Sequence, residues 1–373
     1  RRENFYFAAL RSYQEMHDNY FPELEQAADE FRTIHSIGSK HAVEPESLRQ
    51  ILIDTYGYQI DSERIPQFDG LRQFRSVFDK ESKILYVNPN LTRPQQAFLY
   101  GKEIAFNHLG LADRPYTSNL FQVRSFEEVL ANFQASYFSV ALLLNEKLLL
   151  EDLKIFFARK NWNTEAFMDL LNQYSASPEM FLQRLVNLLP THFGLDQVFL
   201  LRFNDHLAME ADNFDISKEL HIGRQHTPRS NLLNEHYCRR WVSIRILQSL
   251  RDAAIPPQAG EVVIDVQRST YVNSKESYFC ISMARANAPT PQTNISVTIG
   301  ILVDEKSSQT IGFLQDQAAV ERPVNVTCER CAIADCQDRA AAPSAVEKRT
   351  HREHIRKQLS DLLGTSQSPV ANV

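Results

Sequence analysis

Three cysteines crowded near the C-terminal end constrain this chain more than any other feature. Residues 326–343 read VTCERCAIADCQDRAAAP and place Cys328, Cys331 and Cys336 in the spacing Cys-x2-Cys-x4-Cys. Two thiolates that are two residues apart can turn back onto one metal ion, and a third thiolate four residues later can reach the same centre. The sequence therefore predicts that the chain holds a metal-binding segment beside a ligand pocket. We call residues 323–345 the cysteine segment.

Composition bounds the class of protein. With 373 residues, 43% hydrophobic and 23% charged, the chain is long enough for two or three globular domains. A net charge of −6 gives no sign that the chain as a whole binds nucleic acid. Five cysteines, an odd number, fit a reducing cytosol and a metal site better than a disulfide framework. The strongest apolar run, residues 137–150, is broken by polar residues, so we expect a cytoplasmic protein with no membrane partner.

Hydrophobic periodicity predicts an α+β fold. The expected domains are a helical linker or dimerisation region (1–39), a helix-rich domain (40–175), an α+β sensor-type domain (176–322), the cysteine segment (323–345), and a charged helix with a disordered tail (346–373).

Within these domains the pattern predicts particular helices and strands. We expect a hairpin over residues 72–87, helices over 93–109, 126–145, 179–189 and 232–253, and strands over 198–203, 261–266, 278–284 and 296–303.

The stretch ILYVNPNLTRPQQAFLYGKEIAFNH (residues 84–108) resembles the ImmA/IrrE-type metallopeptidase domain. In that family the helix carries His-Glu-x-x-His, two zinc ligands one turn apart and a glutamate that serves as general base. Here the matching positions run from Lys102 through Glu103 to Phe106, and both histidines are gone. Residues 128–135 resemble the family's following helix. The resemblance implies a degenerate zincin-like domain that is not an enzyme; the alternative, an ImmA-type peptidase, would need activity from Glu103.

Two stretches and the cysteine segment together resemble the short-chain fatty-acyl-responsive transcriptional regulators of the PrpR/RamB type. The stretches are EHYCRRW (235–241) and SYFCISMAR (277–285). The resemblance covers roughly residues 40–345. It implies a helix-turn-helix DNA-binding domain, then the degenerate peptidase-like domain, then a GAF-like sensor domain. Because the chain starts at Arg1, we expect the DNA-binding domain to be missing from it. A short-chain acyl-CoA ligand and a homodimer are also implied.

Candidate ligand contacts follow from this resemblance. Arg239 and Arg240 could pair with the phosphates of coenzyme A, which need guanidinium or ammonium partners. Trp241 lies beside them in the sequence, and Lys102 is a further candidate for an anionic ligand. The ordinary alternative is that arginines of this kind are solvated and that Lys102 is structural.

The metal site has three local ligands and an open fourth position. A four-iron cluster needs four ligands, so Cys238 is the expected fourth, with Cys280 as the alternative. Around residues 311–315 the family often has a glycine–cysteine pair, which this sequence lacks. Zinc with three thiolates and His351 or His354 is a second possibility, and it would describe a zinc-stabilised interaction module. Free thiols are the third, since an isolated buried cysteine often acts as a small hydrophobe.

Overall fold

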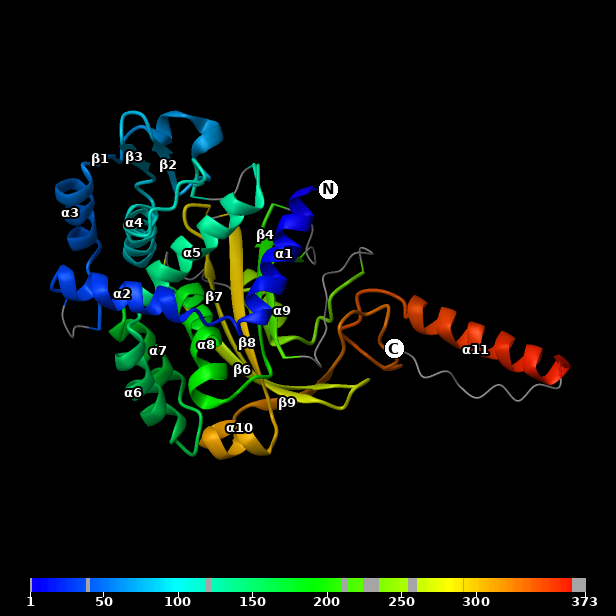
Figure 1. Cartoon of the computed structure of the whole chain (residues 1–373). Helices are drawn as coiled ribbons and strands as arrows, with labels where there is room; N and C mark the ends of the chain where they lie inside the picture. Colours follow the sequence, from blue (N-terminus) through cyan, green and yellow to red (C-terminus); the bar gives the residue numbers. More distant parts are fainter. Residues whose placement is uncertain are drawn as a thin grey trace.

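The computed structural model describes residues 2–37, 41–118, 122–208, 214–223, 235–253, 260–290 and 292–363. These residues form a mixed α and β structure with two sheets (Figure 1). The predicted α+β class is confirmed.

Helices and a small sheet form the first half of the chain. Their bounds are α1 (Arg2–Met16), α2 (Pro22–Ile34), α3 (Pro45–Tyr56), β1 (Gln59–Asp61), β2 (Ser76–Asp79), β3 (Ile84–Val87), α4 (Arg93–His108), α5 (Phe126–Leu143), α6 (Glu146–Phe157) and α7 (Thr164–Gln173), with short 3-10 turns at Ile65–Gln67 and Asp69–Leu71. The small sheet has the order β1-β3-β2. The hairpin and the two helices predicted within residues 72–145 are confirmed.

Local sequence explains where the two central helices start. Thr92 and Gln95 form a capping box at α4, with a proline in the first turn. Ser125 caps α5 by accepting a hydrogen bond from the Glu128 backbone. These caps fix α4 and α5, which carry the candidate peptidase-like residues.

A six-stranded sheet forms the second half, with the strand order β5-β4-β8-β7-β6-β9. Neighbouring strands are antiparallel except for β6 and β9, which are parallel. The bounds are α8 (Pro178–Phe193), β4 (Val198–His206), β5 (Phe214–Ile222), α9 (Val242–Arg251), β6 (Val263–Tyr271), β7 (Ser277–Ala286), β8 (Thr293–Leu302), α10 (Glu305–Thr310), a 3-10 turn (Gly312–Gln315), β9 (Val320–Val324) and α11 (Ser344–Leu363).

The two faces of this sheet belong to different hydrophobic cores. Along β4, Val198 and Leu200 join a core that continues through α8, α5 and α4 to the N-terminal helices. The alternate residues Phe199 and Leu201 join a second core with α9. This alternation follows from the two-residue period of a strand. Figure 1 shows α8 and α9 on either side of the sheet.

The prediction of one helix over residues 232–253 is wrong for residues 235–241. Helix α9 begins only at Val242. Upstream of it, Tyr237 forms an antiparallel bridge with Thr327, and the Cys238 N–H donates to the Val326 carbonyl at 3.1 Å. Backbone pairing with the cysteine segment therefore replaces helical pairing here.

The last helix, α11, lies apart from the rest of the fold. It projects from the body in Figure 1, and none of its residues is buried. Across the ranges that the structure describes, no helix is long and apolar enough to cross a membrane.

Candidate functional site

Lys102 is buried in α4, at the position of the first histidine in the His-Glu-x-x-His pattern. Its ammonium donates to Asn132 Oδ1 at 2.6 Å and to the Ser118 carbonyl at 3.2 Å. Burial lowers the pKa of Lys102 to about 8. Its Nζ lies 5.8 Å from the centroid of the Phe106 ring, which stands one turn later at the position of the second histidine. A protein cation and an aromatic ring thus stand at the positions of the two imidazoles.

Glu103 is neutralised by a second buried cation. Arg114 Nη2 lies 2.6 Å from Glu103 Oε2, and both side chains are largely buried. The Arg114 guanidinium also stacks 3.9 Å from the Phe78 ring centroid and 4.3 Å from that of Phe106. Tyr58 donates to the same carboxylate at 3.1 Å, and burial and Glu103 together raise the pKa of Tyr58 to about 12. Two cations close to this glutamate oppose the binding of a third, metal cation.

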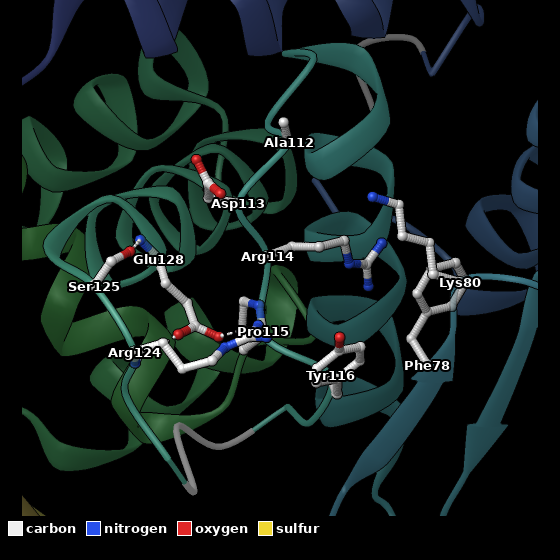
Figure 2. Close-up of a pocket in the computed structure, with 10 residues that line it drawn as sticks. All are labelled: Phe78, Lys80, Ala112, Asp113, Arg114, Pro115, Tyr116, Arg124, Ser125 and Glu128. Carbon is white, nitrogen blue, oxygen red and sulfur yellow. Dashed lines mark hydrogen bonds and ion pairs between the residues drawn. The ribbon is translucent and has the colours of Figure 1, made fainter.

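A cavity of about 350 Å³ lies beside this group. Figure 2 shows its lining, with the Arg114 side chain directed towards Phe78. On the other side, Arg124 pairs with Glu128 at 3.1 Å. The lining is formed by Phe78, Lys80, Ala112, Asp113, Arg114, Pro115, Tyr116, Arg124, Ser125 and Glu128.

The second candidate site forms where residues 235–240 meet the cysteine segment. The Cys328 N–H donates to the His236 carbonyl at 2.8 Å, next to the bridge between Tyr237 and Thr327. This pairing brings Cys238 into the neighbourhood of Cys328 and Cys331. Three thiols from two distant parts of the chain are thereby gathered together.

The pKa of Cys238 reflects both its burial and the nearby thiols. Burial raises the pKa of the Cys238 thiol to about 11, against a lowering effect of the Asn325 and Arg240 backbone. Cys328 and Cys331 raise that pKa further, because a second thiolate nearby disfavours ionisation.

Hydrogen bonds from Arg339 and Ala340 hold the turn that carries the triplet. The Arg339 guanidinium donates to the carbonyls of Cys328 at 2.9 Å and Cys331 at 3.2 Å. The Ala340 N–H donates to Cys328 Sγ at 3.4 Å. A backbone N–H directed at a sulfur stabilises negative charge on it, as a thiolate ligand requires.

Ion pairs attach the segment to residues 235 and 236. Glu329 contacts His236 Nδ1 at 2.8 Å, and Arg330 Nε contacts Glu235 at 2.7 Å. Glu235 also accepts from the Thr327 hydroxyl at 2.7 Å. The segment is therefore fixed by side chains as well as by backbone pairing.

The remaining candidate ligands are Cys336, Cys280, His351 and His354. Cys336 is half-buried within the segment. Cys280 is buried on β7, where its sulfur lies 3.6 Å from Ser269 Oγ and burial raises its pKa to about 12. His351 and His354 are exposed on α11. Within the described ranges, no three His, Cys, Asp or Glu side chains are already arranged to hold a metal ion.

Comparison with known proteins identifies one part of the chain. Residues 54–186 match the family model of the IrrE N-terminal-like domain. These residues form an IrrE-like domain. Among solved structures, a transcriptional regulator of Mycobacterium tuberculosis is similar, with 18% sequence identity and a TM-score of 0.62 over 90% of this chain and 93% of that chain. At this identity the likeness shows a shared fold. No curated protein matches the sequence.

The proposed contacts for coenzyme A do not come together. Lys102 lies within the IrrE-like domain, in the core on the α8 face of the large sheet. Trp241 is buried in the core on the α9 face. Arg239 stacks 4.8 Å from the Phe214 ring centroid, and Arg240 Nε lies 3.6 Å from Asp338 of the cysteine segment. The large sheet thus separates Lys102 from the other three residues.

Sequence reasoning missed most partners in the IrrE-like domain. Asn132 was within a stretch singled out by its resemblance, yet its role as acceptor for Lys102 depends on the packing of α4 against α5. Arg114 follows α4 in a loop with no motif of its own. The sequence did offer one sign of these partners. Lys102 is a charge on an otherwise apolar helix face, and a buried charge needs hydrogen-bond partners.

Proposed function

We propose that this chain is the ligand-sensing part of a cytoplasmic transcriptional regulator, and that it binds a short-chain acyl-CoA and an iron–sulfur cluster. The shared fold with a transcriptional regulator over nine-tenths of the chain supports the regulatory role. The six-stranded sheet with helices on both faces is compatible with a GAF-like sensor domain. The cysteine and Ala-Arg motifs support the acyl-CoA-responsive family.

The observation that carries this proposal is the pairing of residues 235–238 with the cysteine segment. It brings Cys238 near Cys328 and Cys331. The sulfur of Cys280, in contrast, lies next to the Ser269 hydroxyl. Cys328, Cys331, Cys336 and Cys238 would hold the cluster, which supplies redox sensitivity when bound. Because the burial of Cys238 keeps it protonated, ligation would release its proton and depend on pH.

A peptidase role is not part of the proposal. Lys102 and Phe106 offer no imidazole, and Arg114 neutralises Glu103 at 2.6 Å. Zinc-dependent cleavage that disappears in Glu103→Gln would revive that role.

The proposed mechanism is a two-state one. Acyl-CoA would favour one arrangement of the domains and so change how a homodimer of the regulator presents its DNA-binding helices. Half-sites related by a dyad require such a dimer. DNA would thus be a partner of the whole regulator.

Calorimetry with propionyl-CoA and acetyl-CoA tests the ligand. We expect saturable binding together with stabilisation against thermal unfolding. Absence of both at millimolar ligand would rule out the acyl-CoA part of the proposal.

A zinc-stabilised interaction module is the second candidate. The projecting α11 favours it, because Ile355, Leu359 and Leu362 are exposed at helical spacing on one side. A colourless protein that contains one zinc ion would support this module; a brown protein bleached by dithionite would support the iron–sulfur cluster.

A further inference from the structure

One end of the large sheet gathers cations around a single carboxylate. Arg202 on β4 and Arg285 on β7 have the same strand phase as the residues of the larger core, so they face α8. Glu179 in the first turn of α8 meets both of them. Lys218 on β5 is the register partner of Arg202.

Direct contacts define the centre of this group. Arg285 Nη2 donates to the two Glu179 carboxylate oxygens at 3.0 and 3.2 Å. Arg202 Nε lies 3.6 Å from the same carboxylate, and its Nη1 donates to Asn204 at 2.8 Å. The Lys218 ammonium donates to Gln183, one turn further along α8.

A fourth cation comes from the IrrE-like domain. Arg75 directly precedes β2, and its charge interacts with Glu179, Arg202 and Arg285. Among the described residues, no hydrogen bond or ion-pair partner is found for its guanidinium, although it is only partly exposed. Its five N–H groups are therefore available to an acceptor from outside the chain.

One carboxylate cannot balance four cations. Burial alone would raise the pKa of Glu179. The charges of Arg285, Arg202 and Arg75 outweigh this effect and lower the pKa to about 2. The shift at Glu179 indicates a local excess of positive charge, which an anion with several charges would relieve.

We propose that Arg75, Arg202, Arg285 and Lys218 form a binding site for the phosphate or pyrophosphate group of a small metabolite. Guanidinium forks match phosphate oxygens in pairs, and Glu179 keeps Arg202 and Arg285 in place while Arg75 remains available. The identification of the metabolite as an acyl-CoA rests on the proposed function; the phosphate chemistry does not.

The site also links two parts of the fold. Arg75 directly precedes β2 of the small sheet, whereas Arg202, Arg285 and Lys218 belong to the large one. Gln95 Nε2 of α4 donates to the Ala288 carbonyl at 2.9 Å in the turn after β7, so the two parts already touch near Arg285. A phosphate held between them would bias their relative arrangement, which is the coupling that a sensor needs.

Calorimetric titrations of the chain with inorganic pyrophosphate and with coenzyme A test the site. We expect wild type to bind both, and Arg75→Gln and Lys218→Gln each to weaken both affinities by about tenfold or more, the value of a charge-assisted hydrogen bond. Arg72→Gln is the matched control, because Arg72 pairs with Asp69 on the surface at 2.8 Å. The Lys218 variant keeps the test valid should the Arg75 variant fold poorly.

The outcomes separate this inference from the proposed function. Coenzyme A binding that is unchanged in Arg75→Gln and Lys218→Gln would overturn the site and leave the proposed function standing. Pyrophosphate binding that depends on Arg75, with no binding of coenzyme A or its acyl esters, would support the site and refute the ligand assignment. No binding of either probe by wild type would overturn the site.

Discussion

The buried ammonium of Lys102 makes the stability of this protein depend on pH in a defined direction. Its pKa falls from an ordinary value of 10.5 to about 8 in the folded chain, mainly because the charge is desolvated. A drop of that size corresponds to about 3 kcal/mol of folding free energy when the lysine is protonated in both states. This cost is fully present below pH 8.

The sign follows from proton counting. Between pH 8 and 10.5 the unfolded chain binds more protons at this position than the folded chain, so the contribution to stability rises with pH. From pH 7 to pH 9.5 the free energy of unfolding should gain roughly 2 kcal/mol from Lys102. Other groups titrate in this range as well, Cys238 among them, and their effects must be subtracted.

Comparison with Lys102→Met isolates the lysine. Urea unfolding of both proteins at pH 7.0 and 9.5 gives the difference in unfolding free energy at each pH. We expect the unfolding free energy of wild type, relative to that of the variant, to increase by roughly 2 kcal/mol between pH 7.0 and pH 9.5. Lys80→Met, at an exposed position that lines the neighbouring cavity, controls for the loss of one positive charge. A difference that does not change with pH would refute the burial of a charged Lys102.

Two further substitutions test the core by urea unfolding. Glu25→Gln should cost about 3 kcal/mol, because it leaves fully buried Arg184 without the carboxylate that now lies 2.5 Å away; exposed Glu30→Gln in the same helix is the control, and an equal effect of the two would contradict this account. Gly300→Ala should cost about 1–3 kcal/mol, since a Cβ there would overlap the Phe199 ring across the sheet; an unchanged urea midpoint would show that the ring moves aside freely.

The elements with strong local signals were predictable from the sequence. The hairpin before α4 has alternating apolar residues around a polar turn, and α4 and α5 have caps at Thr92 and Ser125. Strand β5 was missed because polar residues occupy much of it, between the buried ends Phe214 and Ile222. Periodicity finds strands only when one face is clearly apolar.

Most contacts between distant segments could not be predicted from the sequence. The segment around Cys238 was predicted as helix because its residues suit one, but pairing with Val326, almost ninety residues away, decides its conformation. The cation group around Glu179 has the same origin, since Arg75 and Arg285 meet only in the folded chain. The sequence did contain one sign of this group. Arg285 is a charged residue at a position of β7 that alternation places among buried apolar residues, so it needs a partner.

Metal and sulfide analysis of cysteine variants tests the central claim most directly. Protein purified without oxygen and reconstituted with iron and sulfide should show broad visible absorption that dithionite bleaches. Cys328→Ser and Cys238→Ser should lose iron and absorption, whereas Cys280→Ser should retain them, because Cys238 lies near Cys328 and Cys331 while the Cys280 sulfur lies next to Ser269. Wild type that binds no iron, or iron lost in Cys280→Ser and kept in Cys238→Ser, would contradict the account.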